Sequence, residues 1–127
     1  DYDPFVAPRI KRGIEISSAS YVRLIQARAD LQRRVHAITR PYDAVIMPTC
    51  AIPAPLIADV AEPDEFTKAN LLLLRNTTVG NFLDRCAISL PCHAEGELPV
   101  GFMMMGEAMA DRRLLSMARS VAPVVKG

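Results

Sequence analysis

Three short apolar segments set the strongest limit on what this 127-residue chain can form. They are residues 42–48, 86–91 and 98–105, and neither of the last two alternates polar with apolar side chains. Segments of this kind are typical of strands that are covered on both faces. We therefore expect three short buried strands, the last two joined as a hairpin with a longer loop around Gly96.

Helical periodicity accounts for most of the remaining residues. Apolar side chains recur at helical spacing after Ser17, a good N-cap, and predict a long helix over residues 17–40. A second helix is predicted over residues 65–74 and a third over residues 111–122, which carries a single apolar stripe.

Prolines and one polar run indicate where helices should not continue. We expect residues 1–16 to be an extended lead-in, because Pro4 and Pro8 disfavour a helix there. Residues 77–81 are expected to break the second helix, and Pro123 is expected to end the third.

The order helix, strand, helix, strand, strand, helix predicts an α/β fold, with α+β as the alternative. In either case we expect a partial mixed β-sheet flanked by helices, with residues 42–122 forming the strand and helix portion. Three helices supply only part of the cover that three buried strands need. The chain also begins at Asp1 and not at Met, so we expect residues 1–127 to be one piece processed or cut from a longer protein.

Charge is balanced overall but unevenly distributed. Residues 1–42 carry eight Lys or Arg against four Asp or Glu, and much of this excess lies on the helix of residues 17–40. The net charge of +1 disfavours a nucleic-acid binder driven by overall charge. We favour a basic helix that is a solvated face or pairs with acids elsewhere in the same protein. The alternative is a self-standing binding module that uses this helix for nucleic acid or an acidic partner.

Cysteine usage and hydropathy indicate a cytoplasmic location. No apolar run approaches the roughly 20 residues of a membrane span, and the first 16 residues have no signal-peptide pattern. Three cysteines, Cys50, Cys86 and Cys92, cannot all pair within one chain, so we expect buried and inert thiols in a reducing compartment.

No complete catalytic set can be assembled from these residues. Cys92 and His93 are neighbours that point to opposite sides of an extended backbone, and Ser89 is expected to be hydrogen-bonded inside a buried strand. No two of the six glycines are adjacent, so there is no phosphate loop or nucleotide fingerprint. We expect no catalytic residue, no metal and no cofactor in this chain.

Four runs stand in a fixed order along the chain: residues 42–49, Asn81 with residues 87–91, residues 98–106, and Asp111 with Leu114, Leu115 and Ala118. In this order and spacing the chain resembles the C-terminal part of the amidase signature family, over roughly residues 5–122. The resemblance implies a hydrolase of carbon–nitrogen bonds in linear amides, in which a serine of a Ser–Ser–Lys triad forms an acyl-enzyme. The triad lies in the N-terminal and middle part of the family, so this piece is expected to be inactive alone.

The resemblance also implies the site and the partners. In the family this region completes a large mixed sheet and closes one side of the substrate pocket. The expected substrate-binding residues are Thr49, Asn76, Thr77 and Asn81, although Thr77 and Asn81 alternatively only cap a turn. The expected partners are a small-molecule amide and the N-terminal part of the same enzyme, and the isolated chain is expected to self-associate through uncovered sheet surfaces.

Four positions depart from the family pattern. Asp84 and Cys86 stand where Gly and Pro are frequent, His93 stands where Gly commonly follows Pro-Cys, and Met103 replaces a common Gln. These departures suggest a divergent subgroup with its own pocket details.

Overall fold

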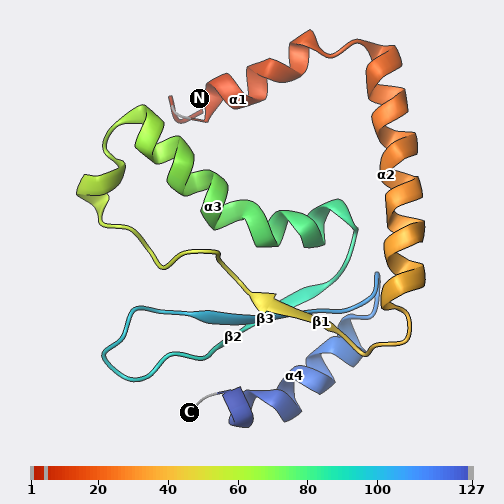
Figure 1. Cartoon of the computed structure of the whole chain (residues 1–127), viewed down its shortest axis with the longest axis vertical. Helices are drawn as coiled ribbons and strands as arrows, with labels where there is room; N and C mark the ends of the chain where they lie inside the picture. Colours follow the sequence, from red (N-terminus) through yellow and green to blue (C-terminus); the bar gives the residue numbers. More distant parts are fainter. Residues whose placement is uncertain (1, 5, 126–127) are drawn as a thin grey trace.

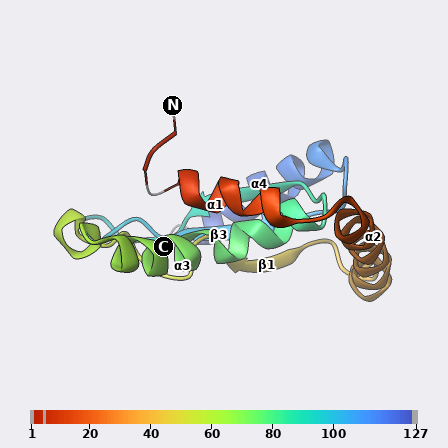
Figure 2. The ribbon, with the colours of Figure 1, turned by 90° about the horizontal axis from the view of Figure 1, so that it is seen from above.

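The sheet lies between two helices, with a third helix along one end (Figure 1). The computed structural model describes residues 2–4 and 6–125. Helix α3 lies on one side of the sheet, α4 lies on the other, and α2 stands at the end of the molecule (Figure 2). The elements in chain order are α1 Ala7–Lys11, a 3₁₀ turn Arg12–Glu15, α2 Ser18–Thr39, β1 Val45–Pro48, a 3₁₀ turn Ile57–Val60, α3 Pro63–Phe82, β2 Ala87–Pro91, β3 Gly101–Met105 and α4 Asp111–Val125.

The three strands pair in the order β1-β3-β2, and both pairs are antiparallel. The predicted mixture of helices and strands is confirmed, as is the hairpin formed by β2 and β3. The strands are shorter than predicted, and within the described residues they form no parallel pair of the kind that a mixed sheet contains.

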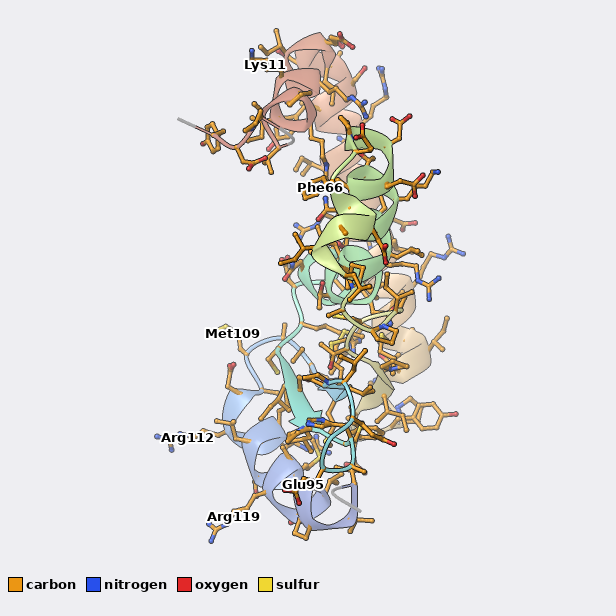
Figure 3. The ribbon with its side chains drawn as sticks, turned by 90° about the vertical axis from the view of Figure 1, so that its left-hand side faces the viewer. Lys11, Phe66, Glu95, Met109, Arg112 and Arg119 are labelled. Carbon is orange, nitrogen blue, oxygen red and sulfur yellow. The ribbon has the colours of Figure 1, made fainter. Side chains whose placement is uncertain are left out.

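Helix α4 covers one face of the sheet. Leu90 of β2 and Met104 of β3 form the core with Leu114 and Ala118 of α4, all of them buried. The opposite face of α4 carries Arg112 and Arg119, which point away from the sheet (Figure 3). This arrangement explains the single apolar stripe of α4.

The predicted stop at Pro123 is wrong, because α4 continues to Val125. Proline removes one backbone donor, and its ring crowds the carbonyl of the preceding turn. So close to the end of a helix, these effects change few hydrogen bonds.

The other face of the sheet lies against α3. Met105 is 2% exposed, and Gly80 of α3 is buried beside it. Burial on both faces is confirmed for β3, where Met103, Met104 and Met105 are all buried. It is wrong for the outer strands, in which Ser89 of β2 is exposed and Ile46 of β1 is 60% exposed. Helix α4 packs mainly against β2 and β3 and leaves Ile46 exposed.

Helix α3 is twice as long as predicted, because residues 77–81 remain helical. It begins at Pro63, since the missing N–H of proline costs nothing in the first turn. It ends in a Schellman motif at Asp84, whose φ is 53°. There the Arg85 N–H donates to the Gly80 carbonyl at 3.0 Å, and the Asp84 N–H donates to the Asn81 carbonyl at 3.4 Å.

Helix α2 is confirmed over the predicted range. The Ser17 side chain caps it by accepting from the Ser20 N–H at 3.2 Å. None of its residues is buried, although it is 22 residues long. Its attachment to α3 is polar: Arg28 donates to the Phe82 carbonyl at 2.8 Å and pairs with Asp84 at 2.5 Å. For Arg28, the predicted pairing with an acid of the same chain is therefore confirmed.

The predicted extended lead-in is wrong for the described residues, which exclude residues 1 and 5. Helix α1 and the 3₁₀ turn Arg12–Glu15 occupy most of it. Pro8 lies in the first turn of α1, where a helix tolerates proline.

The three cysteines differ in exposure. Cys50 is exposed, so the prediction of a buried thiol is wrong for this residue, while Cys86 and Cys92 are half-buried.

None of the helices described combines the length and the apolar composition that crossing a bilayer requires.

The Arg28–Asp84 pair makes one prediction about pH. Hydrogen bonds from Arg28, and then from Gln32, lower the pKa of Asp84 below its usual value of 3.8. An acid whose pKa is lower in the folded than in the unfolded chain stabilises the fold at every pH above its unfolded pKa. The stabilisation from Asp84 is therefore lost as the pH falls below 3.8. We expect Arg28→Ala to raise the pKa of Asp84 in an NMR titration, and Arg34→Ala on the same helix to leave it unchanged. An unchanged pKa in Arg28→Ala would show that the pair is absent in solution.

Candidate active site

A cavity of about 520 Å³ opens at the end of the sheet, on the α3 side. Its walls come from the loop after β1, the end of β2 and the start of β3. No Asp, Glu, Lys or Arg is among the described residues that line it. The lining residues are Pro48, Thr49, Cys50, Ala51, Ile52, Pro53, Ser89, Pro91, His93, Pro99, Val100 and Gly101.

Two hydroxyl groups meet in this cavity across a glycine. The oxygens Thr49 Oγ1 and Ser89 Oγ lie 2.5 Å apart and share a hydrogen bond. Gly101 lies on the strand between them, and the Thr49 N–H donates to its carbonyl at 2.8 Å. A side chain at position 101 would collide with both hydroxyl groups, so glycine is what lets them meet. Ser89 is exposed and not buried in its strand as predicted.

His93 lines the same cavity from just beyond the end of β2. Its Nδ1 atom lies 3.3 Å from the Val100 nitrogen and 3.4 Å from the Val100 oxygen, so the backbone at the start of the returning strand holds the ring. Neighbouring Cys92 does not line this cavity, and lines a separate apolar one with Ile46 and Phe102. The prediction that Cys92 and His93 point to opposite sides is confirmed.

Of the predicted substrate-binding residues, the structure brings Thr49 and Asn76 close together. The Asn76 Nδ2 atom donates to the Pro48 carbonyl at 2.7 Å, which ties α3 to the residue before Thr49. Thr49 lines the cavity itself, while Asn76 fixes the backbone beside it.

Thr77 and Asn81 do not join them. Both lie within α3, and Thr77 donates its hydroxyl hydrogen to the Leu74 carbonyl at 3.2 Å. Asn81 lies five residues beyond Asn76, about 140° around the helix. Thr77 lies inside the helix and caps no turn, whereas the backbone carbonyl of Asn81, one residue before the end of α3, accepts from the Asp84 N–H of the closing turn.

Ser89 and His93 are polar residues of the cavity that were not among the predicted substrate-binding residues. Ser89 becomes recognisable only when Gly101 is known to lie beside it. His93 carried a signal, since it follows a strand directly and departs from the family pattern.

The described residues offer no activated lysine for a Ser–Lys pair. The hydrogen bond to Glu65 raises the pKa of Lys68, whereas a lysine acting as a base needs a lowered one. Lys11 is exposed on α1. Within residues 2–4 and 6–125, no three His, Cys, Asp or Glu side chains gather as metal ligands would.

Comparisons with known proteins place these observations in context. The Amidase family model matches residues 1–115. A 2-amino-5-chloromuconic acid deaminase from Comamonas testosteroni is 30% identical, over 97% of this chain and 27% of that protein. A glutamyl-tRNA(Gln) amidotransferase subunit from Sulfolobus acidocaldarius is 26% identical, over 95% of this chain and 26% of that protein.

A solved structure agrees with the fold. The crystal structure of the corresponding glutamyl-tRNA(Gln) amidotransferase subunit from Thermotoga maritima superposes with a TM-score of 0.66 and 26% sequence identity. The match covers 91% of this chain and 26% of the other. The chain therefore spans about a quarter of the length of the curated relatives that it matches.

Proposed function

Because the chain belongs to the amidase family, we propose that it forms the C-terminal region of a hydrolase acting on amide carbon–nitrogen bonds. The full enzyme uses a serine acyl-enzyme, and its triad lies outside these 127 residues. The observation that supports this most directly is the family match over residues 1–115, together with a cavity that holds hydroxyl groups but no activated lysine.

Within that enzyme, this chain supplies one wall of the substrate pocket. Thr49 presents a hydroxyl group to the substrate, and Asn76 holds the Pro48 carbonyl so that Thr49 keeps its position. Few precisely placed polar groups among apolar walls are what a small-molecule site requires. The substrate is a small-molecule amide.

The N-terminal part of the same enzyme is the proposed partner. Helices α2 and α3 expose apolar side chains that a covering layer would bury. Those on α2 include Tyr21, Leu24 and Ile25, and those on α3 include Leu71, Leu74 and Phe82. Without that cover, the isolated chain is expected to self-associate, which light scattering would detect as a mass above that of the monomer.

The test has two parts. The isolated chain should release no ammonia above background from simple aliphatic or aromatic amides. The upstream reading frame should encode a glycine- and serine-rich loop, with a lysine further upstream. Turnover by the isolated chain that disappears in Ser89→Ala would contradict the proposal, as would an upstream frame without the loop and the lysine.

A further inference from the structure

The lining of the cavity includes His93, a polar side chain that the proposed function has not used, and the atom of interest on its ring is Nε2. The other ring nitrogen, Nδ1, is held by the Val100 backbone, whereas Nε2 has no hydrogen-bond partner among the described residues. In the described lining of this cavity, His93 is also the only residue with a basic side chain.

The backbone contacts favour one tautomer of the neutral ring. The Val100 carbonyl already accepts from the Cys92 N–H at 3.0 Å, while the Val100 N–H has Nδ1 as its acceptor at 3.3 Å. We therefore assign Nδ1 as an acceptor, which places the proton of the neutral ring on Nε2. In the charged ring both nitrogens carry a proton. Nε2–H is thus a donor in either state.

We propose that His93 is a specificity-determining residue, whose Nε2–H donates to an acyl oxygen of a ligand in this cavity. This inference rests on the proposed function. The ligand class is a carboxylate or amide joined to a compact apolar group. The hydroxyl groups of Thr49 and Ser89 and the Nε2–H hydrogen-bond with its oxygen. The proline, isoleucine and valine side chains of the lining contact its apolar group. A volume of about 520 Å³ suits a ligand of that size.

Binding to the 127-residue chain tests the proposal with three probes of similar shape: benzoate, benzamide and benzylamine. The first two carry an acyl oxygen and should bind, whereas the benzylammonium ion has no acceptor and should not. In His93→Gly the affinity for the charged benzoate should fall about tenfold or more, and that for the neutral benzamide about two- to tenfold, the values of one hydrogen bond to a charged and to a neutral acceptor. His36→Ala, on helix α2 outside the cavity, is the matched control and should bind as the native chain does.

Three results would overturn the proposal: equal affinity in His93→Gly, benzylamine binding as well as benzoate, or no binding of either acyl probe at millimolar concentration. A second measurement does not depend on any variant. The ¹⁵N chemical shifts of the neutral His93 ring should show Nε2 protonated, and the opposite tautomer would remove the donor. Binding that depends on His93, combined with an upstream frame lacking the triad, would overturn the proposed function and leave this site intact.

Discussion

Replacing Met105 with alanine is expected to lower the free energy of unfolding by about 2–5 kcal/mol. Met105 is 2% exposed at the end of the central strand, with β1 and β2 on either side and Gly80 of α3 above it. Removing its side chain leaves a void that three separate elements would have to close. Urea denaturation followed by far-ultraviolet circular dichroism measures the loss.

The chain offers a matched control for this change. Met109 is 94% exposed in the turn before α4 and lies at the edge of the molecule (Figure 3). Met109→Ala should change the free energy of unfolding by less than about 0.5 kcal/mol. Equal effects of the two substitutions would mean that Met105 is not enclosed as described.

Gly101→Ala is expected to cost about 1–3 kcal/mol, the usual penalty of overpacking. A Cβ atom there would collide with Ser89 Oγ and would lie 2.5 Å from Thr49 Oγ1 and 3.0 Å from Thr49 Cβ. The hydroxyl pair would have to separate, which also disturbs the cavity. Thermal unfolding reports the stability, and the benzoate titration reports the cavity.

Gly13→Ala is the matched control, because nothing lies within 4 Å of the added carbon. The double variant Gly101→Ala with Ser89→Ala should recover part of the loss, since it removes one of the two colliding hydroxyl groups. If Gly101→Ala is as stable as Gly13→Ala, the close approach of Thr49 and Ser89 is wrong.

Local patterns predicted the elements better than their ends. Helix α2 was predictable because Ser17 and Pro41 mark its ends in the sequence itself. The end of α3 was not, because it depends on Asp84 in a left-handed conformation and on Arg28, which is more than fifty positions away. The polar run 77–81 is tolerated in the helix because Gly80 is buried against Met105.

The sequence predicted all three strands to be buried, and this is too uniform because burial also depends on contacts between distant segments. An apolar segment indicates a strand, but its position in the sheet decides what covers it. The central strand β3 is buried, while Ile46 lies on an edge strand and is exposed. In the candidate site, Thr49 came from the resemblance to the amidase family and its role in substrate binding stays a prediction, whereas the Thr49–Ser89 contact required the pairing of three strands.

The polar attachment of α2 has a consequence for how the chain holds together. Since the helix buries none of its residues, little apolar packing couples the unfolding of α2 to the unfolding of the sheet. Segments with few buried contacts open at low free-energy cost, independently of the global transition. We expect the sheet with α4 to unfold as one cooperative unit, and α2, which is about 33 Å long and is held through polar contacts such as Arg28–Asp84 and Arg85–Thr39, to open separately.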